Sequence, residues 1–202
     1  MGKLRDKITE QSIHLCIDMQ RMFGADGPWA APWVERILTP VSRVASHSPR
    51  RTVFTRFIPA RSAEEAPGMW ARYYRKWEAV TLERLNPEML ELIPPLQRLT
   101  PPAEKFDRTT YSAFTDGRLH NWLRGRGVTA LIISGAETDV CVLATVLAAV
   151  DLGYRTIVVR DALASSADQT HDSLLSLYDS RFDIQIELTE VAELREPWHP
   201  PD

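Results

Sequence analysis

Cysteine is scarce in this sequence, which has only Cys16 and Cys141 among its 202 residues. Two distant cysteines are too few for the disulfide framework of a small secreted domain and are typical of a reducing compartment. Long apolar runs are also missing, because none reaches the roughly 18–20 residues that a transmembrane helix needs. The first eleven residues include several charged side chains and contain no apolar core of the kind found in signal peptides. We therefore expect a cytoplasmic protein with no membrane partner.

The sequence has no surplus of positive charge: its formal net charge is -3 and its pI is about 6.0. This balance gives no electrostatic reason to expect nucleic acid as a partner. The five histidines show no metal-ligand spacing such as i, i+4 on a helix; they are His14, His47, His120, His171 and His199. Without a repeat or a dividing linker, the length predicts one domain over residues 1–202.

Short runs rich in Ile, Val and Leu alternate with helical patterns along the chain. The apolar runs are 13–17, 52–55, 130–134, 156–159 and 184–188, with a weaker sixth strand at 103–109. The helical patterns cover 33–45, 117–126, 142–152 and 169–178. This alternation predicts an α/β fold, with a doubly wound, mostly parallel six-stranded sheet and helices on both faces, a Rossmann-like three-layer sandwich.

The segment 58–85 is harder to assign, but it holds four aromatic residues on one helical face. Trp70, Tyr73, Tyr74 and Trp77 are spaced i, i+3, i+4 and i+7. The simpler interpretation is an amphipathic helix packed on the body or at a subunit interface. The functional interpretation is a lid that borders a substrate pocket.

Ligands of open α/β sheets bind beyond the carboxyl ends of the strands, where three places hold reactive side chains. Cys141 begins the predicted helix 142–152 after a strand. The positive end of the helix dipole favours a thiolate there, and free N–H groups of the first turn could bind an oxyanion. The alternative is a small buried core cysteine.

Asp18 follows the first strand and is a candidate general base, since a nucleophilic cysteine needs a partner to take its proton. The alternative is an aspartate that caps the next loop. Lys105 and Arg108 are three residues apart in a predicted strand, so they should face opposite sides of the sheet. One of the two can supply a cation to the site, and the other is a surface charge.

Together these features resemble the isochorismatase-like cysteine hydrolase superfamily, which includes nicotinamidases and N-carbamoylsarcosine amidohydrolases. The resemblance runs from about residue 13 to residue 188 in matching order. Its motifs are Asp18, Met19 and Gln20 with Phe23, then Tyr-Ser-Ala-Phe at 111–114, residues 135–142, Gly153 with Tyr154, and Asp161 with Ala162.

The resemblance implies an Asp–Lys–Cys triad with Asp18 as base and Cys141 as nucleophile. It also implies a cis peptide bond between Ala136 and Glu137, which turns the N–H groups of Glu137 and Cys141 toward the oxyanion. The family lysine falls three residues before the motif tyrosine, where this chain has Arg108. Either Arg108 substitutes for it, which register favours, or a local shift lets Lys105 serve.

Metal ligands of the family are missing as well. Nicotinamidases resembling this chain carry Asp-x-His-Pro after the second strand, whereas residues 55–59 read Thr-Arg-Phe-Ile-Pro. We therefore expect no metal and no cofactor, and we do not expect nicotinamide as substrate. Arg56, in this stretch, either pairs with an anionic substrate or forms a surface salt bridge.

The predicted activity is hydrolysis of a small amide or carbamoyl compound by a protein that is expected to form a homo-oligomer. The substrate pocket is expected to include Gln20, Phe23, Phe57, Trp70 and Phe114. Two alternatives stay open. One is vinyl-ether hydrolysis of the isochorismatase type, which relies on the aspartate. The other is a non-catalytic relative that binds a small molecule.

Overall fold

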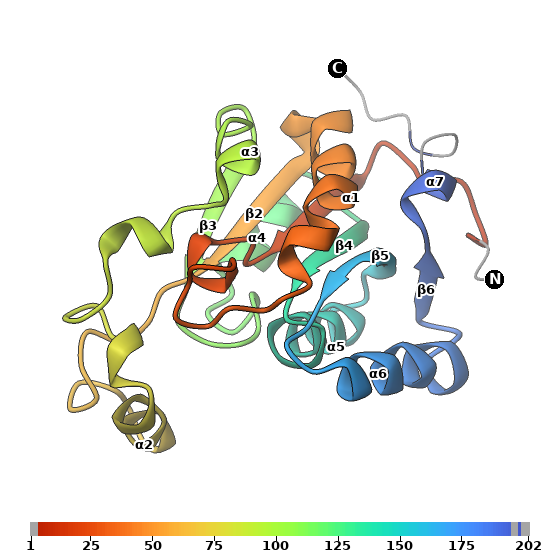
Figure 1. The fold of residues 1–202 in the computed structure, drawn as a ribbon. Helices are drawn as coiled ribbons and strands as arrows, with labels where there is room; N and C mark the ends of the chain where they lie inside the picture. Colours follow the sequence, from red (N-terminus) through yellow and green to blue (C-terminus); the bar gives the residue numbers. More distant parts are fainter. Residues whose placement is uncertain (1–3, 195–197, 199–202) are drawn as a thin grey trace.

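The computed structural model, which describes residues 4–194 and Trp198, contains a six-stranded sheet (Figure 1). All neighbouring strands are parallel, in the order β3-β2-β1-β4-β5-β6. The strands are β1 (Ser12–Ile17), β2 (Thr52–Phe57), β3 (Glu104–Arg108), β4 (Ala130–Ala136), β5 (Arg155–Ala164) and β6 (Ile186–Thr189). The predicted α/β class is confirmed, and the weak sixth strand is the edge strand β3.

Helices cover both faces of this sheet. They are α1 (Val34–His47), α2 (Met69–Lys76), α3 (Pro94–Gln97), α4 (Arg118–Gly125), α5 (Leu143–Asp151), α6 (Asp168–Arg181) and α7 (Val191–Leu194). Short 3-10 turns lie at Arg21–Phe23, Pro49–Arg51, Glu78–Val80 and Pro87–Leu90, and a π-helical turn lies at Thr138–Val142. Among the described residues, no helix is long and apolar enough to cross a bilayer.

The two faces of the sheet belong to separate apolar clusters. The first includes the buried residues of α1, α3 and α7, and the second includes those of α4 and α5 with Tyr178 of α6. All six residues of β1 are buried; Cys16 belongs to the first cluster, and Ile13, Leu15 and Ile17 belong to the second. A strand buried on both faces is typical of a parallel sheet, and in β1 the second face also buries the polar side chains of Ser12 and His14.

The strand order reverses between β1 and β4, which places a topological switch point at their carboxyl ends. Gly135 pairs with Ile17 there and has a φ of 114°. A Cβ atom on Gly135 would lie 2.0 Å from the Ile17 carbonyl oxygen, so only glycine fits. This close approach brings the residues that follow β1 beside the loop that follows β4.

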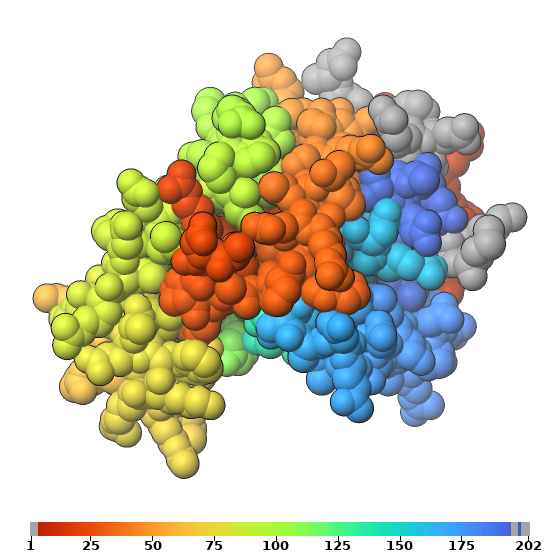
Figure 2. Space-filling model, in the orientation of Figure 1, coloured from red at the N-terminus to blue at the C-terminus, as the bar shows by residue number. Residues whose placement is uncertain are grey.

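The segment between β2 and α3 forms an arm that projects from the body and contains α2 (Figures 1 and 2). The helix predicted from the spacing of four aromatic residues is confirmed as Met69–Lys76, with Trp77 at its C-cap. The arm has its own small apolar cluster, in which Tyr74 packs with Ala63, Ala66 and Val80. The remaining aromatic side chains of α2 are therefore left to face the body.

A buried histidine in β1 makes the stability of the fold sensitive to acid. His14 is fully buried, with Nε2 2.7 Å from Ser134 Oγ, and burial lowers the pKa of His14 to about 3. The unfolded chain takes up this proton near pH 6.5. His14 therefore does not reduce the free energy of unfolding above about pH 6.5. Below that pH, proton uptake by His14 of the unfolded chain lowers the free energy of unfolding as the pH falls toward 3, by at most about 1.4 kcal/mol per pH unit.

Urea unfolding at pH 7.0, 6.0 and 5.0 tests this expectation, with His14→Gln as the variant that cannot titrate there. The wild type should lose stability relative to the variant at each step down in pH. Parallel pH profiles for the two proteins would contradict the assigned protonation state of His14.

Candidate active site

Three ionisable side chains meet at the carboxyl edge of the sheet, and all three are buried. Asp18 follows β1, Arg108 ends β3, and Cys141 lies in the π-helical turn after β4. Arg108 Nη2 is ion-paired with Asp18 Oδ2, and both groups lie close enough to the Cys141 thiol to act on its pKa. The fold therefore brings together the aspartate, one basic residue and the cysteine that the sequence singled out.

Asp18 is held in an unusual backbone conformation. Its φ of 48° is the one positive value of a non-glycine residue within the described part of the chain. Such values are uncommon outside glycine, although aspartate tolerates them better than most residues. Thr55 Oγ1 donates a 2.7 Å hydrogen bond to Asp18 Oδ1, and the Asp18 N–H donates to the Thr55 carbonyl at 3.2 Å. Both carboxylate oxygens are thus engaged, one by Thr55 and the other by Arg108.

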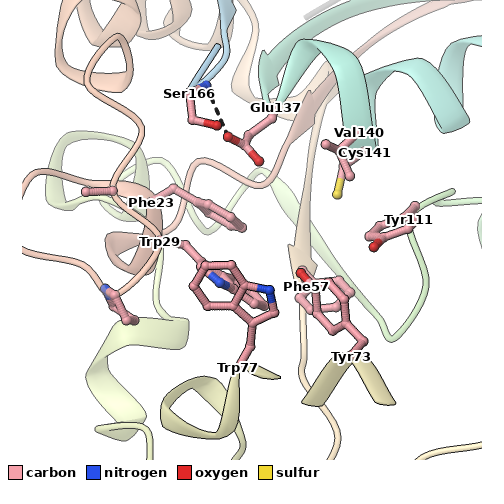
Figure 3. Close-up of a pocket in the computed structure, with 12 residues that line it drawn as sticks. Phe23, Trp29, Phe57, Tyr73, Trp77, Tyr111, Glu137, Val140, Cys141 and Ser166 are labelled. Carbon is pink, nitrogen blue, oxygen red and sulfur yellow. Dashed lines mark hydrogen bonds between the residues drawn. The ribbon is translucent and has the colours of Figure 1, made fainter. Parts of the chain in front are cut away.

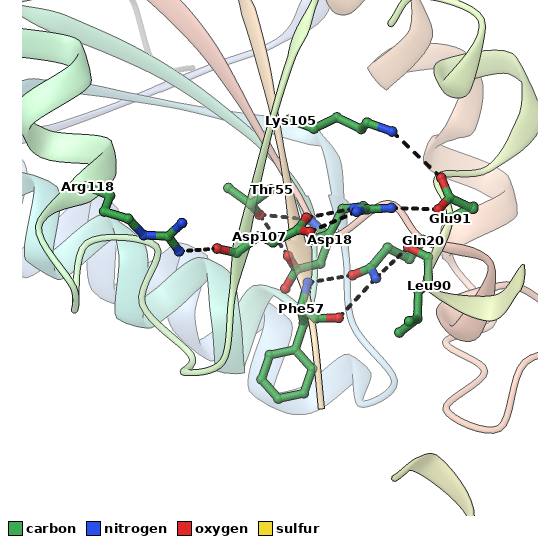
Figure 4. Close-up of polar contacts among 10 residues, drawn as sticks. Asp18, Gln20, Thr55, Phe57, Leu90, Glu91, Lys105, Asp107 and Arg118 are labelled. Carbon is green, nitrogen blue, oxygen red and sulfur yellow. Dashed lines mark hydrogen bonds and ion pairs between the residues drawn. The ribbon is translucent and has the colours of Figure 1, made fainter. Parts of the chain in front are cut away.

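Arg108 and Lys105 point to opposite sides of β3, as the period of a strand requires. The Arg108 guanidinium passes 5.5 Å from the centroid of the Phe57 ring and reaches Asp18 from two strands away. It also donates to the Thr110 carbonyl. Lys105 Nζ instead lies 3.8 Å from Glu91 Oε2 (Figure 4). The expectation that Lys105 serves the site is therefore wrong, and Arg108 is the basic residue beside Asp18.

Cys141 lies deeper in its helix than the sequence indicated, because the helical segment begins at Thr138 rather than at the cysteine. The expectation of a resting thiolate stays a prediction. Burial raises the pKa of the Cys141 thiol well above its usual range, and the charge of Asp18 adds to this effect. Arg108 lowers the same pKa but does not outweigh them. Burial and the charge of Asp18 therefore oppose the ionisation that the helix dipole favours.

The loop that carries Cys141 is fastened to the segment after β5. The Ala136–Glu137 peptide bond is cis, as the family resemblance implies. Glu137 Oε1 accepts from the Ser166 N–H at 3.1 Å, and Thr138 Oγ1 lies 2.8 Å from Nδ1 of His171. These contacts on successive residues fix the position of the thiol relative to the sheet.

The Cys141 thiol opens onto a pocket of about 300 Å³ whose walls are mainly aromatic (Figure 3). The lining residues are Phe23, Pro28, Trp29, Ala30, Phe57, Tyr73, Trp77, Tyr111, Glu137, Val140, Cys141 and Ser166. Asp18 and Arg108 are buried and do not line it. A ligand in this pocket lies against the Cys141 sulfur, next to the buried ion pair of Asp18 and Arg108.

Trp29 is the centre of the aromatic wall. Its ring centroid lies 6.0 Å from those of Phe23 and Phe57, 6.1 Å from Tyr73 and 6.2 Å from Trp77. The loop before α1, strand β2 and the arm each contribute to this group. The arm borders the pocket through Tyr73 and Trp77, which is the role that the lid interpretation assigned to it.

Two of the five expected pocket residues, Phe23 and Phe57, line the pocket, and Gln20 does not. Gln20 is fully buried, and its side-chain carbonyl accepts from the Phe57 N–H at 2.7 Å. Its NH₂ group donates to the Phe57 and Leu90 carbonyls at 3.0 and 2.9 Å (Figure 4). Gln20 therefore positions Phe57 and has no group free for a substrate.

The other two expected pocket residues lie behind the wall. Trp70 packs against Tyr111 with ring centroids 4.8 Å apart, and Phe114 stacks on Tyr154 at 5.9 Å. The expectation that Trp70 and Phe114 line the pocket is wrong, because other rings separate them from it. Tyr111 is instead the lining residue of the Tyr-Ser-Ala-Phe motif, and it was available in the sequence as a signal.

Arg56 is part of a surface ion-pair group. It lies 2.7 Å from both Asp107 and Glu91, which favours the salt-bridge interpretation over a contact with substrate. Within residues 4–194, no three His, Cys, Asp or Glu side chains are grouped to hold a metal ion. His199 lies outside the described residues. The expectation that the protein uses no metal stays a prediction.

Comparison with known proteins places the chain in a family. Residues 12–190 match the isochorismatase domain family. The chain belongs to the isochorismatase family. The resemblance drawn from the sequence motifs is therefore confirmed.

The relatives include nicotinamidases. Nicotinamidase 3 of Arabidopsis thaliana is 28% identical over 173 residues, which cover 85% of this chain and 82% of that protein. A probable inactive nicotinamidase of the same plant is 40% identical over 68 residues, so this match spans only 33% of the chain and 35% of that relative. The crystal structure of a cysteine hydrolase from Pseudomonas syringae pv. phaseolicola has the same fold, with a TM-score of 0.79, 23% identity, and coverage of 96% and 95% of the two chains.

Proposed function

We propose that this isochorismatase-family protein is a cysteine-dependent amidase that hydrolyses a C–N bond of a small amide or carbamoyl compound through a thioester. The observation that carries the proposal is the position of Cys141. Its thiol opens onto an aromatic pocket and is backed by the buried Asp18–Arg108 pair. The amidase relatives favour this reaction over other hydrolyses.

In the first half of the reaction, the thiol proton moves to the Asp18 carboxylate as the sulfur attacks the carbonyl carbon. The raised pKa of Cys141 means that this transfer accompanies attack instead of preceding it. The resulting oxyanion accepts hydrogen bonds from the backbone N–H groups of Glu137 and Cys141. Asp18 then returns the proton to the leaving nitrogen, and the amine departs.

In the second half, water attacks the thioester carbon and gives a proton to Asp18. The C–S bond breaks, the acid is released, and the sulfur regains the proton from Asp18. Arg108 cannot take part in these transfers, because its guanidinium stays protonated. It supplies a fixed positive charge that orients Asp18 and stabilises the sulfur when it is anionic. Asp18 therefore carries every proton in both halves.

Ammonia release from a panel of small amides, ureas and carbamoyl compounds tests this function. We expect at least one primary amide to be hydrolysed by the purified protein. No release from any member would favour the alternative of a non-catalytic relative that binds a small molecule. Two observations favour this non-catalytic alternative. Arg108 takes the place of the family lysine, and the chain is similar to a probable inactive nicotinamidase.

We further propose that the substrate is a small molecule, that the protein has no nucleic acid or membrane partner, and that it forms a homo-oligomer. That residues 1–202 form a single domain also stays a prediction. Isochorismatase-type vinyl-ether hydrolysis, the remaining alternative, uses the aspartate without a cysteine. It is separated from amidase activity by whether turnover depends on Cys141.

A further inference from the structure

The charge inside the pocket has one sign. Glu137 is the only lining residue in the described chain whose side chain is charged at neutral pH. Its Oε1 atom is held by the Ser166 N–H, and its carboxylate points into the pocket beside Phe23 (Figure 3). A bound group of positive charge would meet a fixed carboxylate, whereas an anionic group would meet a like charge.

Among the described residues that line the pocket, none carries a positive charge that could offset Glu137. Arg108 does not line the pocket and is already paired with Asp18. Lys76 Nζ lies 5.4 Å from the centroid of the Trp77 ring, but Lys76 does not line the pocket. The pocket therefore has no counter-charge for a carboxylate on the substrate.

The aromatic wall provides a second reason to favour a cation. Rings of Trp and Tyr attract cations over their faces, and the attraction grows when water is excluded. Trp29, Tyr73 and Trp77 stand together on this wall, with Trp29 next to both of the others. Trp29 also lies next to Phe23 and Phe57, so several ring faces line one wall of the pocket.

We propose that the substrate is a small amide that also carries a cationic amine or quaternary ammonium group. The cation is held by the rings around Trp29 and by the carboxylate of Glu137. This inference rests on the proposed amidase function for its amide group, but the cation site itself is a matter of binding alone. Glu137 is then a specificity-determining residue through its side chain.

The test compares ligands that differ in charge but little in shape. Trimethylammonioacetamide and 3,3-dimethylbutanamide are isosteres in which a quaternary nitrogen replaces a quaternary carbon, and malonamate supplies a small anionic amide. Binding is measured by calorimetry on Cys141→Ala, so that turnover does not interfere. We expect the cation to bind at least about tenfold more tightly than its neutral isostere and malonamate to bind most weakly.

Glu137→Gln in the same background keeps the acceptor for the Ser166 N–H but removes the charge. It should lose most of the preference for the cation and change the affinity for the neutral isostere by less than about twofold. Glu10→Gln, at an exposed site outside the pocket, is the matched control and should keep the preference. Equal binding of the two isosteres, or a cation preference that survives Glu137→Gln, would overturn the proposal.

The outcome for charge selection is separable from the outcome for catalysis. If the wild type releases ammonia from neutral amides while both isosteres bind equally, the amidase function stands and the cation site falls. If the cation binds preferentially and no amide is ever hydrolysed, the cation site stands and the amidase function falls.

Discussion

Replacing Cys141 with alanine is expected to lower kcat/KM for amide hydrolysis by at least about 10⁴-fold. Among the pocket-lining residues that the structure describes, Cys141 is the one whose side chain can form the thioester. The fold should persist, because the side chain removed is small and lies at the edge of its apolar cluster. Ammonia release by the purified variant, with circular dichroism to verify folding, measures the effect.

Cys16→Ala is the matched control for this loss. Cys16 is wholly buried in β1 on the opposite face of the sheet, so its removal should lower stability and leave the activity of the folded protein within about twofold. Full activity of Cys141→Ala would contradict the mechanism. It would also revive the vinyl-ether alternative, in which the aspartate acts without a cysteine.

Asp18→Asn should lower kcat by about 10²–10⁴-fold, the range expected when a general acid–base group is removed. Asparagine has nearly the same shape and can still accept the hydrogen bond from Thr55. It cannot take the thiol proton, and it leaves the Arg108 charge without its partner. Because Arg108 exchanges no proton, no neighbouring group in the triad can substitute for the lost base.

Asp107→Asn is the control for charge removal at the same sheet edge. Asp107 pairs with Arg56, which keeps Glu91 as a second partner, and neither residue lines the pocket. Its kcat should stay within about twofold of the wild type. An Asp18→Asn variant with a normal kcat would remove Asp18 from the mechanism even if Cys141 were essential.

The sequence predicted the fold well because the central strands are buried on both faces. Such strands, β4 above all, appear as apolar runs that surface segments do not imitate. The helix α2 was also predictable, since four aromatic residues at helical spacing have no other regular arrangement. The edge strand β3 was the weakest prediction, because its outer side has no neighbouring strand and it tolerates charged residues.

The site was only partly predictable, because side-chain reach cannot be derived from strand period. Period placed Lys105 and Arg108 on opposite faces but did not say which face held Asp18. That depended on the length of the arginine side chain crossing β2 beneath Phe57. Gln20 was misplaced for a similar reason: a polar residue close after Asp18 resembles a ligand contact, whereas its amide is used entirely by backbone groups.

The pocket wall was missed for another physical reason, and the environment of the thiol was only partly predicted. Trp29 lies in a loop, where no periodicity shows which way a side chain points. The sequence therefore did not indicate that Trp29 lines the pocket. The helix dipole favours a thiolate at Cys141, but burial of the sulfur and the adjacent carboxylate act in the other direction.

The central claim, that the sulfur of Cys141 is the reactive group in the pocket, is tested most directly by titration with iodoacetamide. Cys141 is 6% exposed on the pocket wall, whereas Cys16 is 0% exposed and does not line the pocket. Peptide mass mapping should find one carboxamidomethyl group per chain, on Cys141 and not on Cys16, with ammonia-releasing activity falling in proportion. Full modification of Cys141 with activity retained, or loss of activity with Cys141 unmodified, would contradict the account.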